Sequence, residues 1–231
     1  MSEPRVRYHD ELRRVEAHVQ SMGAAAQDLF AKAVRAVCED DIALGERVII
    51  GDDVIDEYYL RTEERILNLF ALQTPVASDL RLLTVLLHIN IHLERIGDMA
   101  VNLAKIGKLA SGLPRSATVI AHLDEMGTVA LRMIGASMEA FSRRNLELAR
   151  TLPDMDEPID RLNRGMLQEV LEIADERNML EWGIRMHVVS RQIERTGDHA
   201  VDIAEQVAFL LTGVFKEFTD ASHPEVTAHD S

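Results

Sequence analysis

Apolar residues recur at alternating spacings of three and four along most of the chain, and polar residues fill the positions between them. This spacing places the apolar side chains on one face of an α-helix, as in a helical bundle. No segment alternates apolar and polar residues one by one, as a half-buried strand would. The pattern predicts an all-α protein of long packed helices. The first apolar series consists of Leu12, Val15, Val19, Met22, Ala26, Leu29, Ala33 and Ala36.

The apolar series of the first helix is repeated 104 residues later in the chain. A second helix follows in each half, and its positions from Val48 to Leu69 match those from Leu152 to Ile173. Asp41 and Asn145 precede the second helices at equivalent places, and both residue types are favoured N-caps. An internal repeat of this length indicates a duplicated structural unit. The second copy of the first series consists of Ser116, Val119, Leu123, Met126, Ala130, Met133, Ser137 and Ala140.

Gly112 and Pro114 interrupt the helical pattern in the middle of the chain. We therefore expect six helices in two tandem three-helix bundles, with short connections that make neighbouring helices antiparallel. The first bundle spans residues 1–112 and the second spans residues 113–218. Residues 219–231 lack apolar periodicity, which predicts a flexible tail.

The clearest chemical signal is a motif in the third helix of each half. Residues 94–104 read ERIGDMAVNLA and residues 194–204 read ERTGDHAVDIA, so seven of the eleven letters agree. The agreement includes polar residues, whereas packing alone would require only similar hydrophobicity. A Glu and an Asp four residues apart lie on one face of a helix, about 6 Å from each other, where they can bind one cation. The two pairs are Glu94 with Asp98 and Glu194 with Asp198.

The second helix of each half brings further carboxylates. Asp52 and Asp156 interrupt its apolar face at equivalent places, and another Asp follows each of them four residues later. If the chain reverses direction near residue 74, between the second and third helices of the first half, antiparallel packing sets Asp52 beside Asp98 or Met99. The same argument applies to the second half, so we predict two equivalent oxygen-rich metal sites. The ligands expected from the second helices are Asp52, Asp56, Asp156 and Asp160.

The residues around these carboxylates bear on which metal would bind and on whether the carboxylates form ion pairs instead. Carboxylates favour Mg²⁺, Mn²⁺, Ca²⁺ or iron, and Zn²⁺ becomes possible if an imidazole joins them. His187, one heptad before the second motif, is a candidate for that imidazole. Asn102 stands where the second half has Asp202, so the two sites need not be alike. The alternative is that the carboxylates form surface ion pairs, with Arg95 and Arg195 as partners.

The charge, the cysteine count and the absence of certain motifs each disfavour a class of protein. Asp and Glu outnumber Lys and Arg by 39 to 25, which gives a formal charge of -14 and disfavours binding to nucleic acid. Cys38 is the only cysteine, so no intrachain disulfide can form. Charges interrupt every apolar run before the ~20 residues of a membrane span, and no signal-peptide core precedes them, so we expect a cytoplasmic protein. No nucleophile with a matching base and no glycine-rich phosphate loop is present, so we expect no enzyme.

The duplicated segments LERIGDMAVN and IERTGDHAVD resemble the signature of the PhoU family, as does QTPVASDLRLL before the first of them. The resemblance extends over nearly the whole chain. It implies a pair of three-helix bundles, homodimerisation, and multinuclear clusters of Fe, Zn, Mg or Mn at the carboxylate motifs. It also adds Asp202 as a further ligand of the second site. The second half departs from the pattern before its motif, where MLEWGIRM replaces SDLRLLTV.

The resemblance implies a negative regulator of phosphate uptake and of phosphate-regulon signalling. The expected partners are the ATPase subunit of the phosphate ABC transporter and a phosphate-sensing histidine kinase, which the protein would join at the membrane only peripherally. The alternative is a carboxylate-bridged metal enzyme or metal store, because four-helix di-iron proteins also place Glu residues on facing helices. Those proteins typically add Glu-x-x-His ligands, which neither ERIGD nor ERTGD contains.

Overall fold

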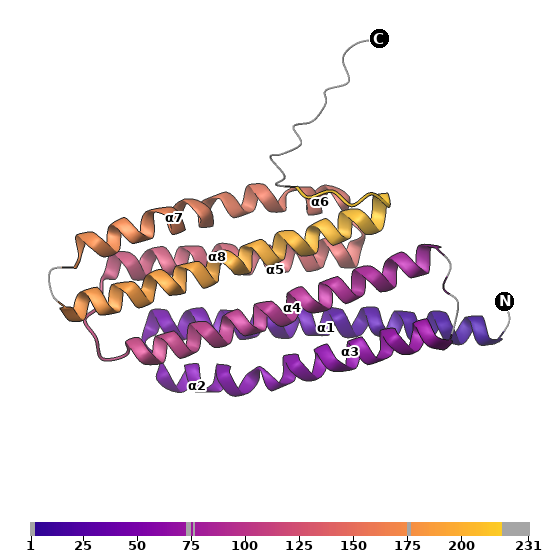
Figure 1. Cartoon of the computed structure of the whole chain (residues 1–231), viewed down its shortest axis with the longest axis horizontal. Coiled ribbons are helices and arrows are strands. Elements are labelled where there is room, and N and C mark those ends of the chain that lie inside the picture. The colour runs from indigo at the N-terminus through magenta and orange to yellow at the C-terminus, as the bar shows by residue number, and fades with distance from the viewer. Residues whose placement is uncertain (1–2, 73–74, 76, 175–176, 219–231) are drawn as a thin grey trace, which may run out of the picture.

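The computed structural model describes residues 3–72, 75, 77–174 and 177–218. These residues form helices that run along the long axis of the molecule, and they include no β-strand (Figure 1). The all-α prediction is therefore confirmed, while the predicted tail at 219–231 lies outside the described residues. None of the described helices combines the length and apolar character that crossing a membrane requires. The helices are α1 (Glu3–Glu39), α2 (Ile42–Gly51), α3 (Asp53–Leu72), α4 (Ala77–Ala110), α5 (Ala117–Arg143), α6 (Leu146–Arg150), α7 (Leu152–Glu172) and α8 (Arg177–Thr212).

The second helix of each half is divided in two, so that the predicted six-helix plan appears as eight helical segments in the described residues. In the first half the division falls at Asp52, directly after Gly51, a residue type with low helix propensity. In the second half it falls at Thr151, because Pro153 lies in the first turn of α7 and has no N–H to continue the preceding helix. The order of the helices is the same in both halves, but the two interruptions fall at positions that are not equivalent in the repeats.

The first helix of each half ends in a matching turn. Asp40 and Arg144, which are 104 residues apart, both have left-handed backbone conformations, with φ of 58° and 51°. Such a residue reverses the chain after the last helical turn. Asp41 and Asn145 then cap the next helix, because each side chain accepts a hydrogen bond from the backbone N–H three residues later, at 2.8 Å and 3.1 Å. Both predicted N-caps are confirmed.

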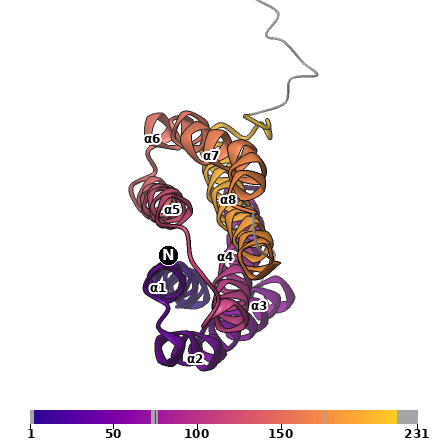
Figure 2. The same cartoon turned by 90° about the vertical axis from the view of Figure 1, so that its left-hand side faces the viewer.

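The two halves pack side by side. In the end-on view of Figure 2, α1 to α4 gather at one end of the cross-section and α5 to α8 at the other. α4 packs against α8 and α1 packs against α5, so the halves share one hydrophobic core. Every residue of the first predicted apolar series is buried. In its second copy only Ser116 is not buried, because its side chain caps the N-terminus of α5.

Candidate functional site

The first carboxylate cluster lies where the junction of α2 and α3 packs against α4. Asp52 sits directly against Gly97, since a Cβ atom at Gly97 would lie 2.8 Å from Asp52 Oδ1. This neighbour is within two residues of the position that antiparallel packing predicts. Burial, followed by the negative charges of Asp56, Asp98 and Glu94, raises the pKa of Asp52 to about 6. The charges of the other three predicted carboxylates of the first half therefore act on Asp52, although among the described residues no three of these four side chains bring their oxygen atoms within 4.8 Å of one another.

Arg95 forms ion pairs with two members of this first cluster. Its Nε lies 3.5 Å from Glu94 Oε2, and its Nη1 lies 3.4 Å from Asp98 Oδ2. Burial and the charge of Asp98 nevertheless raise the pKa of Glu94, against the opposing effect of Arg95. The Arg95 side chain is 52% exposed, and ion pairs at such positions stabilise proteins little. The ion pairs that the alternative interpretation predicts for Arg95 are thus present in the first half, but for Glu94 they do not offset the effect of burial on its pKa.

The second carboxylate cluster lies between α7 and α8. A Cβ atom at Gly197 would overlap Asp156 Oδ1, so the glycine allows this carboxylate to pack against α8. Burial, followed by the charges of Asp160, Asp198 and Glu194, raises the pKa of Asp156 to about 7. Burial also raises the pKa values of Glu194 and Asp198, with a neighbouring carboxylate as the next cause in each case. The charges of the other three predicted carboxylates of the second half therefore act on Asp156, although among the described residues no three of these four side chains bring their oxygen atoms within 4.8 Å of one another.

Two oxygens of this second cluster are buried without a hydrogen-bond partner: Asp156 Oδ1 and Glu194 Oε2. The other Glu194 oxygen forms an ion pair with Arg191, and Glu194 as a whole is only 8% exposed. At the exposed edge of the cluster, Asp160 Oδ2 lies 3.7 Å from Arg164 Nη1. A buried carboxylate oxygen that lacks a donor is energetically costly. The arrangement therefore suits a cation better than it suits isolated carboxylates.

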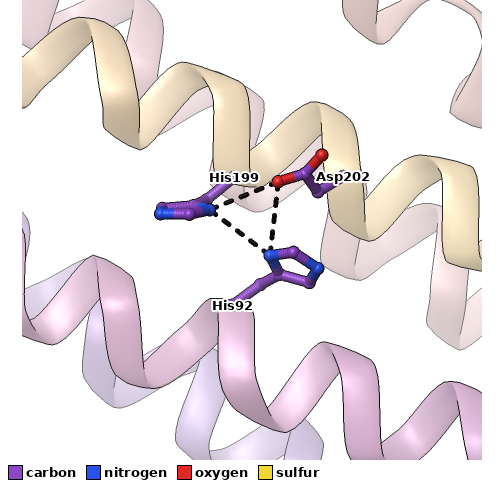
Figure 3. Close-up of side chains that lie close together, drawn as sticks. All are labelled: His92, His199 and Asp202. Atoms are coloured by element: carbon purple, nitrogen blue, oxygen red, sulfur yellow. Dashed lines mark hydrogen bonds and ion pairs between the residues drawn. The ribbon is translucent and has the colours of Figure 1, made fainter. Parts of the chain in front are cut away.

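A third group of polar side chains lies between the halves, where α4 contacts α8 (Figure 3). His92 projects from α4, and His199 and Asp202 project from α8, so that His92 Nδ1, His199 Nδ1 and Asp202 Oδ2 are each 3.3 Å from the other two atoms. Burial lowers the pKa of His92 to about 4 although the Asp202 carboxylate opposes the shift, so the His92 ring is neutral at pH 7. Among the described residues, this is the only group of three His, Cys, Asp or Glu side chains whose ligand atoms all lie within 4.8 Å.

The sequence analysis assigned Asp202 to the second carboxylate site and did not select His92 or His199. Comparison of the repeats does not identify these histidines, because the residue equivalent to His92 is a glutamine and the residue equivalent to His199 is a methionine. The available signal was the spacing of three between His199 and Asp202, which places both side chains on one helix face. His187, the imidazole suggested for the second site, is half-buried, its Nδ1 has no hydrogen-bond partner, and it is not part of this third group.

Comparison with known proteins identifies the family. The family model described as the PhoU domain matches residues 19–107 and residues 123–207, one match in each half. The chain belongs to the PhoU family. PhoU proteins are regulatory accessory proteins and not enzymes, in agreement with the absence of catalytic residues expected from the sequence.

Relatives of known name match along most of the chain. The phosphate-specific transport system accessory protein PhoU homolog of Rhizobium meliloti is 32% identical, over 89% of this chain and 87% of that protein. The protein of the same name from Caulobacter vibrioides is 30% identical, over 89% of this chain and 90% of that protein. The crystal structure of PhoU from Pseudomonas aeruginosa superposes with a TM-score of 0.84 at 28% identity, over 90% of this chain and 100% of that one. The fold is therefore the PhoU fold.

Proposed function

We propose that this chain is a metal-binding accessory protein that negatively regulates phosphate transport and phosphate-regulon signalling. The observation that carries the proposal is the match of both halves to the PhoU domain. The names of the relatives, which describe accessory proteins of phosphate-specific transport systems, support the regulatory role. The carboxylate clusters at equivalent places in the two halves support the metal-binding part.

In this proposal the protein acts by binding and performs no covalent chemistry. As an adaptor on the cytoplasmic side of the membrane, it contacts the ATPase subunit of the phosphate ABC transporter and a sensor histidine kinase. It holds the kinase inactive because it binds the inactive form more tightly than the active one. A shift of such an equilibrium from 1:99 to 99:1 requires a differential affinity of about 5.5 kcal/mol. We also propose that the adaptor is a homodimer, as its resemblance to the family implies.

The two carboxylate clusters fit hard metal ions such as Mg²⁺, Mn²⁺ or iron, which oxygen ligands hold. The two unpartnered buried oxygens of the second cluster support this fit, because each lacks the positive partner that a cation would provide. A bound ion would supply the positive charge that offsets repulsion among the carboxylates and would fix α7 against α8. The first cluster offers equivalent donors, but Arg95 already pairs with two of them, so we expect weaker binding there. The proposed ligands are Asp52, Asp56, Glu94, Asp98, Asp156, Asp160, Glu194 and Asp198.

The metal-binding part is tested by heat unfolding of protein that has been freed of metal with a chelator. Binding to the folded state alone raises the free energy of unfolding by about 2.7 kcal/mol at ~100 times the dissociation constant. We expect Mg²⁺, Mn²⁺ or Fe²⁺ to raise the melting temperature of the parent protein. A variant with Glu94→Gln, Asp98→Asn, Glu194→Gln and Asp198→Asn together should not respond. A control with Asp28→Asn and Glu139→Gln, which removes two exposed helix-surface carboxylates, should respond like the parent.

The regulatory part is tested in the host by deleting every copy of the gene. We expect phosphate-starvation genes to be transcribed at high phosphate in this strain and to be repressed again when the parent gene is restored. The carboxylate variant described above should restore repression less fully at equal protein level. Normal repression in the deletion strain would contradict the regulatory proposal. A carboxylate variant that responds to metal as the parent does would contradict only the metal-binding part.

A further inference from the structure

We propose that His92, His199 and Asp202 form a separate metal site that takes a tetrahedral, zinc-class ion and links the two halves of the chain. These residues are called the His-His-Asp group below. His92 belongs to α4 and the other two residues belong to α8, whereas each carboxylate cluster lies within one half. The group therefore lies at the contact between the repeats (Figure 3). This inference does not depend on the proposed role in phosphate regulation.

Hydrogen bonds account for at most two of the three contacts among these atoms, so that one contact is always left without a proton between its two atoms. A neutral imidazole nitrogen is either a donor or an acceptor, and an ionised carboxylate only accepts. If both Nδ1 atoms carry protons, each N–H can donate to Asp202 Oδ2, and the 3.3 Å contact between the two nitrogens then holds no hydrogen bond. If one or both lack a proton, a nitrogen lone pair faces the lone pairs of Asp202 Oδ2 at the same distance. A cation between the three atoms satisfies all of them at once.

The spacing of the three atoms matches a tetrahedral ion. Bonds of about 2.0–2.1 Å to Zn²⁺, arranged tetrahedrally, place neighbouring donor atoms about 3.3–3.4 Å apart. The same bond lengths around an octahedral ion such as Mg²⁺ place them only about 2.8–3.0 Å apart. All three separations in the His-His-Asp group are 3.3 Å. The triangle therefore has the dimensions of one face of a tetrahedral zinc site, which leaves one coordination position free.

That free position has space beside it. His92 and Asp202 line a pocket of about 670 Å³, together with His88, Glu205 and Phe209. A site with three protein ligands and an open fourth position can hold water or an exchangeable ligand. Glu205 Oε1 already accepts a hydrogen bond of 2.7 Å from the backbone N–H of Phe218, so we expect water as the fourth ligand.

The donor set also sets this site apart from the carboxylate clusters. Two imidazoles and one carboxylate suit Zn²⁺, whereas sites made of oxygen alone suit Mg²⁺, Ca²⁺ or Mn²⁺. The equivalents of His92 and His199 in the opposite halves are Gln192 and Met99, so the duplication does not create a second such site. One ion at this place would join α4 to α8. Its occupancy would therefore strengthen the packing of one repeat on the other.

The test measures zinc bound to the full chain after removal of metal and dialysis against Zn²⁺ as the only added divalent ion. We expect the parent to retain a zinc ion that His92→Gln and His199→Gln do not, with affinity lowered at least about a hundredfold, because loss of even an outer partner costs about 10–100-fold. Co²⁺ serves as a spectroscopic probe, since tetrahedral Co²⁺ absorbs visible light much more strongly than octahedral Co²⁺. The parent should show the strong absorption and both variants should lose it.

Two control variants separate this site from its surroundings. His88→Gln alters the same pocket from the same helix, one turn away from His92, and should leave zinc binding unchanged. The variant lacking Glu94, Asp98, Glu194 and Asp198 should also keep the zinc ion, whatever happens to its response to Mg²⁺. If the histidine variants do not fold, as judged by circular dichroism, Asp202→Asn is the substitute, because the first half already carries Asn102 at the equivalent position. Equal zinc binding by parent and site variants, or a weak octahedral Co²⁺ spectrum in the parent, would overturn the proposal.

Discussion

Substituting Gly197 tests how the second carboxylate cluster is assembled. Gly197 lies in the middle of α8, where a side chain would normally favour the helix. A Cβ atom there would overlap Asp156 Oδ1 and would lie 3.4 Å from Asp156 Cγ and from Ile159 Cδ1. Because Ile159 is fully buried, α7 has little room to move away. Gly197→Ala should therefore displace the Asp156 carboxylate or separate α7 from α8.

Two opposing effects set the size of the change in stability. Ala is favoured over Gly inside a helix by about 1 kcal/mol. Overpacking in a well-packed region costs about 1–3 kcal/mol. The net result for Gly197→Ala is a loss of about 0–2 kcal/mol in the free energy of unfolding. Gly165→Ala in α7 is the matched control, because its Cβ would meet only Glu169 Oε1, at 3.8 Å, and it should gain the helix-propensity term.

The assay is urea unfolding of metal-free protein, followed by far-ultraviolet circular dichroism and by the fluorescence of the buried Trp182 of α8. The difference between the two variants isolates the steric cost at Gly197, about 1–3 kcal/mol. Gly197→Ala should also reduce the stabilisation by Mg²⁺ or Mn²⁺, whereas Gly165→Ala should preserve it. If Gly197→Ala stabilises the protein as much as Gly165→Ala does, the close packing of Asp156 on α8 is wrong.

The pKa values of two partly buried groups, Asp156 and Cys38, can each be tested. Folding raises the pKa of Asp156 from 3.8 to about 7, so the stability that its protonation contributes is complete below the lower value and is lost as pH rises through the higher one. Asp156→Asn should therefore remove part of the fall in unfolding free energy between about pH 4 and pH 7 in metal-free protein, and an unchanged urea-unfolding profile would contradict this. Burial raises the pKa of Cys38 from 9.0 to about 11, so at pH 8 the folded protein should react with a thiol reagent roughly a hundredfold more slowly than the urea-unfolded chain. Native and unfolded rates within a few-fold of each other would show that the thiol is not shielded.

The positions of the carboxylates could be predicted from the sequence pattern, but their side-chain contacts could not. The apolar period and the repeat were enough to set Asp52 within two residues of its observed neighbour Gly97. They did not distinguish the two clusters, which differ in burial and in ion pairs. Arg95 pairs with both motif carboxylates of the first half, whereas Arg191 engages one oxygen of Glu194 and leaves the other buried without a partner. Those differences depend on side-chain conformations that the repeat does not encode.

The sequence by itself determined the helical class, the duplication, the N-caps and the grouping of carboxylates within each half. These features arise from short-range periodicity and from antiparallel neighbours, so each can be deduced inside one repeat. Only the tertiary structure decided how one repeat faces the other. The contact of α4 with α8 brings His92 beside His199, 107 residues later, and neither residue has a counterpart of its own kind in the other half. A site built from unlike residues of two repeats leaves no periodic signal, because its geometry exists only once the halves have packed together.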